Sequence, residues 1–182
     1  SLHDALPISV SSYPKISRAT YIHGKGHEFI ISSVGIDEGN TLKEKLNIAV
    51  HCIDFMKKLK KTPKIATLSY ARPGDYGRSE EINQSLDDAK KLTQLIEKHT
   101  NQKIENSCVL IDQAIKNKCN ILIAPNGIVG NTIFRTLVLL NSWPSFGAIT
   151  FGIDDIYIDT SRDQSREGYL RSLELAYKLA KL

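Results

Sequence analysis

The alternation of short apolar runs with amphipathic helical segments is the feature that most constrains the fold of this chain. Residues 65–69 and 120–125 are apolar runs bounded by turn-forming residues, and each has the length of a buried strand. Apolar residues recur at intervals of three and four over residues 42–59 and 80–98, as is typical of helices with one buried face. Such alternation favours β-α units, so we predict an α/β fold with a mainly parallel sheet and flanking helices.

Two local signals predict elements that precede the first buried strand. Thr41 and Glu44 have the spacing of a capping box, in which each side chain satisfies a backbone N–H at the start of a helix. Residues 16–22 and 28–33 are rich in β-branched residues and flank a glycine-containing turn. This pattern predicts a β-hairpin.

Acidic residues stand in the loop before the first predicted helix. Gly35, Asp37 and Glu38 lie between the hairpin and the capping box. One interpretation is that they position a substrate, and the other is that the carboxylates compensate the helix dipole. The sequence leaves both open.

The composition excludes several functional classes. With 182 residues and 41% hydrophobic content, the chain can bury the core of one domain. The net charge of +4 comes from basic residues spread over the helices with few aromatic residues beside them, so we expect no nucleic-acid binding. No apolar run approaches the roughly 20 residues needed to cross a bilayer. Three widely spaced cysteines indicate free thiols in a reducing cytoplasm. We therefore expect a cytoplasmic protein with no membrane contact and no metal site.

The first residues do not belong to the predicted fold. Residues 1–9 show neither helical nor strand periodicity and lack an initiator methionine. We expect them to be an artefact or a disordered terminus. Residues 10–182 are assigned to one α/β domain.

The first candidate site follows the strand at residues 65–69. Ligands of open α/β sheets gather at the carboxyl ends of the strands, and a polar, glycine-containing loop follows here at residues 70–78. Ser69 and Arg72 are therefore candidate substrate- or anion-binding residues, with Arg78 as a further residue to test. The alternative is that these arginines are ordinary solvent-facing side chains.

The second candidate site follows the strand at residues 120–125. We expect a loop at residues 126–130 and a helix that opens at Asn131, whose side chain can cap it. A glycine at position 130 permits positive φ and lets a ligand approach the backbone. Asn126, Gly130 and Asn131 are therefore candidate anion-binding residues. Their spacing matches neither the phosphate loop nor the dinucleotide fingerprint.

A third candidate site is the sequence Asp159-Thr160-Ser161-Arg162, which we expect between a short hairpin and the last helix. A hydroxyl and a guanidinium beside the free N–H groups of a helix N-terminus would bind an anion. Asp159 could form a buried pair with Arg162 and orient its guanidinium toward phosphate or carboxylate. The alternative is that Ser161 only caps the last helix, because serine is common at helix starts.

Several strings in order resemble the C-terminal domain of the phosphate acetyl/butyryltransferase family. They are residues 65–69, residues 120–125, Gly130-Asn131 and Asp159-Thr160-Ser161-Arg162. The resemblance implies a phosphate acetyltransferase-like fold of the isocitrate/isopropylmalate dehydrogenase-like superfamily. It also implies that an N-terminal part of the family fold, which forms the other wall of the cleft, is missing from this chain.

The closer resemblance is to a divergent archaeal group, the methyltransferase-associated methanogenesis marker proteins called Mtx subunit X. Residues 34–39, 130–136 and 159–162 are similar to strings typical of that group. The resemblance covers the chain from about residue 16 to its end.

The resemblance to the acyltransferases implies catalytic roles for Ser161 and Arg162. In those enzymes the matching pair contacts the reacting thioester and phosphate, where a hydroxyl can donate to a developing oxyanion and a guanidinium can hold phosphate. This sequence departs from them elsewhere. Their helix arginine, their catalytic aspartate and the aspartate after the strand proline fall on Leu139, Gly168 and Asn126.

By resemblance, we expect a transferase-like protein of archaeal methanogenic one-carbon metabolism with an anion-binding cleft. It would bind a small anionic substrate, form a homodimer, act with methyltransferase partner proteins, and use a pterin or corrinoid methyl carrier. The first alternative is a phosphate acyltransferase that uses acyl-CoA and phosphate, with coenzyme A as its cofactor. The second is a non-catalytic subunit that binds an anion or a cofactor. No residue pattern specifies a methyl donor.

Overall fold

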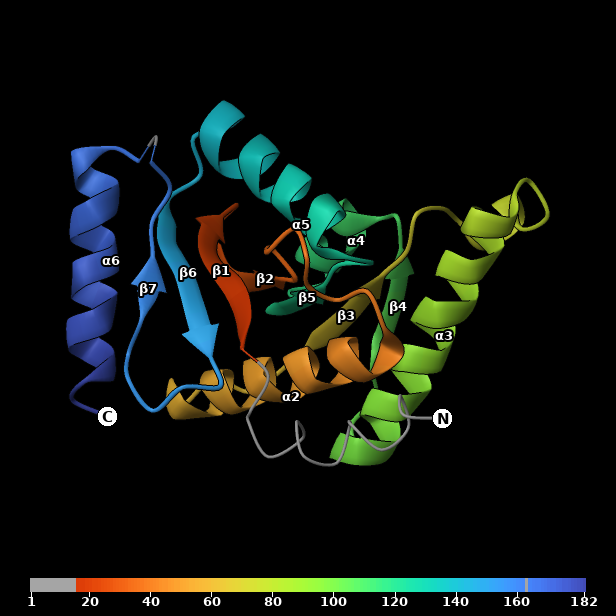
Figure 1. Ribbon diagram of the computed structural model, residues 1–182, viewed down its shortest axis with the longest axis horizontal. Helices are drawn as coiled ribbons and strands as arrows, with labels where there is room; N and C mark the ends of the chain where they lie inside the picture. Colours follow the sequence, from red (N-terminus) through yellow and green to blue (C-terminus); the bar gives the residue numbers. More distant parts are fainter. Residues whose placement is uncertain (1–15, 163) are drawn as a thin grey trace, which may run out of the picture.

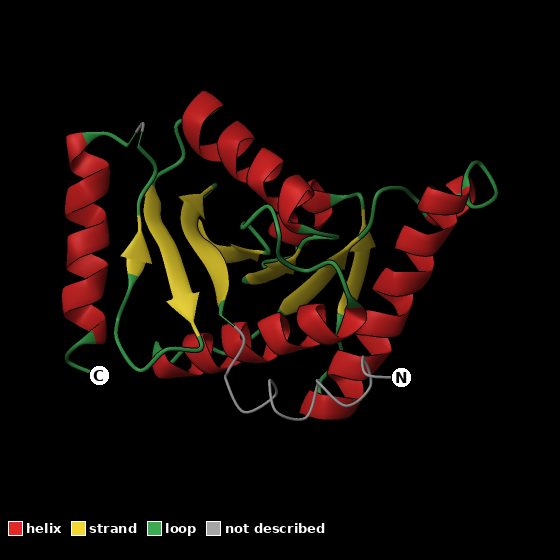
Figure 2. Cartoon of the chain, in the orientation of Figure 1, coloured by secondary structure: helices red, strands yellow, loops and turns green. Residues whose placement is uncertain are grey.

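The computed structural model describes residues 16–162 and 164–182. These residues form a seven-stranded sheet with helices on its faces (Figures 1 and 2), which confirms the predicted α/β fold. Residues 1–9, for which we expected an artefact or a disordered terminus, lie outside the described residues.

The elements follow one another in the order that the alternation predicts. The strands are β1 (Ser17–Gly24), β2 (His27–Ser32), β3 (Ile65–Leu68), β4 (Glu105–Cys108), β5 (Ile121–Ile123), β6 (Ser145–Phe151) and β7 (Ile158–Asp159). The helices are α2 (Leu42–Lys58), α3 (Glu80–Thr100), α4 (Ile111–Lys116), α5 (Gly127–Phe134) and α6 (Arg166–Leu179). A 3₁₀ turn, η1 (Pro73–Asp75), follows β3, and a π-helical segment, η2 (Arg135–Leu140), continues α5.

The sheet has two halves that differ in strand direction. Its order is β4-β3-β5-β2-β1-β6-β7. In the parallel half, β4, β3, β5 and β2 pair in parallel. In the antiparallel half, β1, β6 and β7 pair antiparallel, and β1 also pairs antiparallel with β2. The sheet is therefore mixed, because the β1–β2 hairpin reverses the chain within it.

Both local signals near the start of the chain are confirmed. The hairpin turns through Lys25 and Gly26, whose φ angles of 54° and 66° suit a tight two-residue turn. Thr41 Oγ1 accepts a hydrogen bond from the Glu44 N–H at 3.2 Å, as in a capping box. The Glu44 carboxylate accepts from the N–H of Asn40 at 2.9 Å, one residue earlier than the standard box.

Two layers of helices enclose the sheet. Apolar residues of α2, α3 and α6 pack in one core cluster with one face of the strands, and those of α4, α5 and η2 pack in a second cluster with the other face. Strand residues such as Ile121, Leu122 and Ile123 have no exposed surface. Strands that are buried on both faces have continuous apolar sequences, so these strands could be predicted from the sequence.

Two predicted helix starts are wrong. Helix α5 begins at Gly127, and its N-cap is Asn126, whose side chain accepts from the Val129 N–H at 3.0 Å. Helix α6 begins at Arg166 with Ser165 as its N-cap, so Ser161 does not cap it. Asn131 therefore lies inside α5 rather than at its start.

The early start of α5 has a tertiary cause. Glycine disfavours helices, so Gly127 and Gly130 suggested a loop. A side chain at Gly127 would overlap the carbonyl oxygen of Gly35, and one at Gly130 would overlap that of Ser33. The glycines let α5 approach the end of β2 closely, and packing outweighs helix propensity.

Candidate functional site

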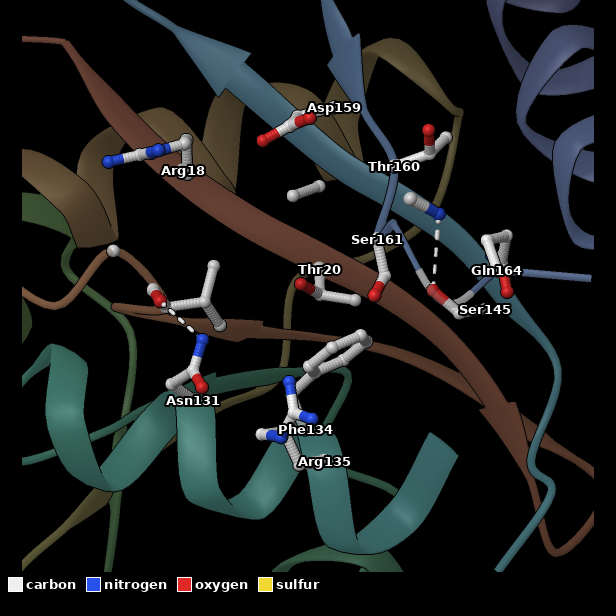
Figure 3. Close-up of a pocket in the computed structure, with 14 residues that line it drawn as sticks. Arg18, Thr20, Asn131, Phe134, Arg135, Ser145, Asp159, Thr160, Ser161 and Gln164 are labelled. Carbon is white, nitrogen blue, oxygen red and sulfur yellow. Dashed lines mark hydrogen bonds between the residues drawn. The ribbon is translucent and has the colours of Figure 1, made fainter. Parts of the chain in front are cut away.

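A cavity of about 180 Å³ lies between the antiparallel half of the sheet and the helix formed by α5 and η2 (Figure 3). Its sheet side comes from Thr20 of β1 and from Ser145, Gly147 and Ala148 of β6. The segment after β7 contributes Asp159, Thr160, Ser161 and Gln164, and the α5–η2 helix contributes Asn131, Phe134 and Arg135. The loop after β2 and Arg18 complete the lining. The cavity therefore lies at the seam between the two halves.

Ser161 reaches the cavity because of how β7 packs on β6. Gly147 has φ +88°, and a Cβ there would lie 2.9 Å from the carbonyl oxygen of Asp159. The glycine thus allows β7 to lie close beside β6. In Figure 3 the half-buried Ser161 side chain points toward Thr20. Ser161 is therefore part of the cavity lining.

Arg18 is a cavity residue that the sequence did not reveal. Its Nε donates to Glu38 Oε1 at 2.8 Å, and its backbone N–H donates to Glu38 Oε2 at 3.1 Å. Asp37 lies 3.7 Å from Nη2. The hydrogen bond to Glu38 is the main cause that raises the pKa of Arg18, so the guanidinium stays charged and is held in one orientation. Glu38 therefore serves to position Arg18, which neither of our two interpretations of this loop included.

Gly35 provides the space for this pair. A Cβ at Gly35 would lie 2.5 Å from Glu38 Oε1 and 2.6 Å from Arg18 Nη2. Any side chain there would displace the carboxylate or the guanidinium. The signal available in the sequence was the run Gly35 to Glu38, but its arginine partner is 20 residues away in the chain.

Asn131 ties the α5 wall to the loop after β2. Its Nδ2 donates to the carbonyl oxygen of Val34 at 3.2 Å, and Figure 3 shows this bond at the edge of the cavity. Asn131 therefore fixes the distance between two walls rather than capping a helix.

The charges of the lining are nearly balanced. Arg18 and Arg135 carry two positive charges, and Asp159 carries one negative charge. Asp37 and Glu38 stand beside Arg18 and reduce its field at long range. The cavity can therefore hold a small anion by directed hydrogen bonds at close range more than by electrostatic steering.

The structure brings three of the eight predicted site residues together and places five elsewhere. Asp159, Ser161 and Asn131 line the cavity. Arg162 is exposed and is not part of the lining. Asp159 is also exposed, so the expected buried pair with Arg162 is wrong.

The other four predicted residues have structural roles or lie apart from the cavity. Ser69 is buried and donates its hydroxyl to the carbonyl oxygen of Ala71 at 2.9 Å. Asn126 caps α5, and its Nδ2 donates to the Tyr70 hydroxyl at 2.7 Å. Gly130 is in packing contact with Ser33. Arg72 lines a separate, open hollow with Tyr70 and Arg78.

In residues 16–162 and 164–182 no group of three or more His, Cys, Asp or Glu side chains is placed to hold a metal ion. Within these ranges no helix has the length and apolar character to cross a bilayer. The three cysteines are buried and free, and burial raises the pKa of Cys52 and Cys119, so neither is a ready nucleophile.

The fold places the chain in a known structural class. A branched-chain phosphotransacylase from Enterococcus faecalis superposes with a TM-score of 0.70 at 20% identity, covering 92% of this chain and 64% of that one. A phosphotransacetylase from Streptococcus pyogenes gives 0.67 at 20% identity, with 92% and 55% covered. A 4-hydroxythreonine-4-phosphate dehydrogenase from Klebsiella pneumoniae gives 0.63 at 12% identity, with 90% and 54% covered. The chain thus has a phosphotransacetylase-like α/β fold.

Sequence comparison identifies the family within this class. The "Putative methyltransferase mtx subunit X" of Methanosarcina mazei is 36% identical over 145 residues, which are 79% of this chain and 51% of that protein. An uncharacterized methyltransferase of Methanopyrus kandleri is 30% identical over 171 residues, 92% of this chain and 66% of that protein. No family model matches the chain. The chain belongs to the family of the archaeal mtx subunit X proteins, which confirms the resemblance noted in the sequence. It spans about half the length of the Methanosarcina relatives that it matches.

Proposed function

We propose that the cavity binds a small anionic substrate and that the protein is a methyltransferase-related subunit of archaeal methanogenic one-carbon metabolism. The observation that carries this proposal is that Ser161, Asn131 and the Glu38-oriented Arg18 line one cavity in a chain of the mtx subunit X family. The protein would act in the cytoplasm as a homodimer with methyltransferase partner proteins. A pterin or corrinoid carrier would bring the methyl group.

The size of the cavity limits what it can hold. Pockets for whole cofactors measure roughly 300–1,000 Å³, whereas this cavity has about 180 Å³. It suits a phosphate or carboxylate group, and a larger carrier would place only such a group inside. Arg18 would hold the anion while the Ser161 hydroxyl donates a hydrogen bond to it.

A phosphate acyltransferase that uses coenzyme A is the second candidate, and the fold favours it. Two positions argue against the acyltransferase. Leu139, where the acyltransferases carry an arginine, is partly buried against the second core cluster. Gly168, where they carry a catalytic aspartate, is buried beneath the side chain of Gln164. Neither position supplies a charged group. If no transfer reaction occurs, a subunit that only binds an anion or cofactor is the third candidate.

Binding of simple anions tests the substrate class. Isothermal titration calorimetry with inorganic phosphate, coenzyme A and a tetrahydromethanopterin derivative should show binding to the wild-type protein. Ser161→Ala should weaken phosphate binding by about tenfold, the cost of one hydrogen bond to a charged group. Equal affinity of Ser161→Ala and wild type for every ligand would contradict a role for this hydroxyl in the cavity.

The reaction class needs separate assays. Formation of acetyl-CoA from acetyl phosphate, lost in Ser161→Ala, would favour the acyltransferase. Methyl transfer from a methylated pterin or corrinoid protein, in the presence of a copurified methyltransferase, would favour the proposed function. Tight binding without turnover in either assay would favour the non-catalytic subunit.

A further inference from the structure

The short connections that lead into the parallel strands are rich in lysine. These connections are residues 25–26 before β2, 57–64 before β3, 98–103 before β4 and 116–120 before β5. Together they contain ten lysines and no aspartate or glutamate. The whole chain has 24 basic and 20 acidic residues. Without these ten lysines the chain would carry a net negative charge.

The fold gathers these lysines, which the sequence spreads along the chain, at one edge of the sheet. Strands β2, β3, β4 and β5 are parallel, so their amino ends lie at the same edge. Polar contacts join the connections there. His27 Nε2 lies 2.9 Å from the carbonyl oxygen of Cys119, and the Asn120 side chain accepts from the Lys64 N–H at 2.8 Å. We call the ten lysines the basic edge: Lys25, Lys57, Lys58, Lys60, Lys61, Lys64, Lys98, Lys103, Lys116 and Lys118.

Helix ends and local contacts explain only part of the basic edge. Lysine in the last turn of a helix compensates the helix dipole. Helices α2, α3 and α4 end in such lysines, which are Lys57, Lys58, Lys98 and Lys116. Lys61 forms an ion pair with Glu28, and Lys64 Nζ donates to the carbonyl oxygen of Asn117. Among the described residues, the lysines with neither role are Lys25, Lys60, Lys103 and Lys118, and all four are exposed.

Three of these four lysines stand where the backbone favours glycine. The φ angles of Lys25, Lys60 and Lys118 are 54°, 57° and 62°. Lys60 and Lys118 follow the C-caps of α2 and α4, where glycine is the usual residue, and Lys25 is the first residue of a two-residue hairpin turn. A lysine in this conformation costs free energy that a glycine would not. The turns therefore do not explain the lysines, and the outlying backbone points to a role for their charge.

The composition of the basic edge favours an acidic protein over other polyanions. The connections contain no arginine, so they lack the group that best holds a phosphate or a base by two hydrogen bonds. None of the large apolar side chains exposed in the described residues lies in these connections. No such side chain is therefore available to stack on bases or to insert into a lipid surface. Ammonium groups on flexible stems suit the carboxylates of a negatively charged protein, which they attract at long range.

We propose that the basic edge is the docking surface for an acidic face of a partner protein. The edge lies at the amino end of β2, whereas Val34 and Gly35, which line the cavity, follow its carboxyl end. A partner at the edge would therefore lie at the other end of this strand from the cavity. The proposal does not depend on what the cavity binds, so phosphate affinity is a separate measurement.

A triple glycine variant tests the basic edge. Lys25→Gly, Lys60→Gly and Lys118→Gly together remove three charges at positions whose φ suits glycine, so the variant should fold with the urea midpoint of the wild type. The probe is fluorescein-labelled poly-L-glutamate, and fluorescence anisotropy measures its binding to the 182-residue chain. The variant should bind it about tenfold more weakly or worse, and the affinity of the wild type should fall as salt is added.

Two control variants separate the position of the charges from their number. Lys43→Gln, Lys90→Gln and Lys91→Gln together remove the same net charge from exposed positions outside the edge. This variant should bind poly-L-glutamate within about twofold of the wild type, because its lost charges are distant and screened. Arginine at the three edge positions keeps the charge there and should also preserve binding. All three variants should bind inorganic phosphate as the wild type does.

Four results would overturn the proposal. The first is a wild-type chain that does not bind poly-L-glutamate even at low salt. The second is a glycine variant that binds as tightly as the wild type. The third is a glycine variant with a lowered urea midpoint, which would show that the lysines stabilise the turns. The fourth is tighter binding of a DNA duplex or of anionic phospholipid vesicles through the same lysines, which would assign the edge to a nucleic acid or a membrane.

Discussion

The two halves of the sheet use their surfaces differently. In the parallel half, β3 and β5 are buried on both faces, and the end of β2 is filled by the close approach of α5 at Gly127 and Gly130. In the antiparallel half, polar side chains such as Thr20 face a cavity, and α6 leaves apolar side chains such as Leu173 exposed. The parallel half provides rigidity, and the cavity lies against the antiparallel half. The rule that ligands gather at the carboxyl ends of parallel strands led to Ser69 and Arg72 after β3, neither of which lines the cavity.

The largest effect should come from disturbing the close packing in the parallel half. Gly130→Ala would place a methyl group against the carbonyl oxygen of Ser33, and α5 must move away. We expect it to lower the free energy of unfolding by about 3 kcal/mol, the upper range for overpacked sites. Urea denaturation of the variant and the wild type measures this difference in the free energy of unfolding.

Gly74→Ala is the matched control, because nothing lies within 4 Å of a Cβ built there. It should change stability by less than about 0.5 kcal/mol. If Gly130→Ala were as stable as wild type but bound phosphate poorly, Gly130 would face a ligand and the assignment to packing would be wrong.

This contrast also explains what the sequence could predict. The hairpin, the capping box and the buried strands depend on neighbouring residues, so their patterns are visible in the sequence. The start of α5 depends on the carbonyl groups of Gly35 and Ser33, about 90 residues away. Arg18 was missed because only the fold brings it to Glu38. Ser161 was found through a family resemblance, since serine before a helix equally suggests a cap.

The second prediction compares one arginine from each half. Arg18→Gln removes the oriented guanidinium from the cavity, so we expect phosphate affinity to fall between about tenfold and a hundredfold. Arg72→Gln, in the open hollow after β3, should leave phosphate affinity unchanged. Calorimetry of both variants against wild type measures the difference. If Arg72→Gln lost phosphate affinity and Arg18→Gln did not, the anion site would lie in the parallel half.

The third prediction concerns Tyr21 of β1. Its hydroxyl donates a hydrogen bond to Glu28 at 2.8 Å and accepts one from Lys61 at 2.8 Å. Burial raises the pKa of Tyr21 from 10.0 to about 12. Because the folded-state pKa is above the unfolded value, the stabilising contribution is complete below pH 10 and is lost as the pH rises toward 12.

Between pH 9 and 11 the wild-type protein should lose about 1 kcal/mol more stability than Tyr21→Phe, which has no proton to release. Denaturation curves at several pH values give this difference. Parallel pH profiles for the two proteins would show that the hydroxyl of Tyr21 titrates as in an unfolded chain.

The smallest effect on stability is expected for Ser161→Ala. It distinguishes a structural role of this serine from a role in binding. Ser165 caps α6 by accepting from the Gly168 N–H at 3.1 Å, so Ser165→Ala should cost about 1 kcal/mol of unfolding free energy. Ser161 lies before the cap and lines the cavity. Ser161→Ala should therefore change stability by less than about 0.5 kcal/mol while it weakens phosphate binding. The opposite result, in which Ser161→Ala destabilises the protein and leaves binding intact, would return this serine to the structural role that its sequence position first suggested.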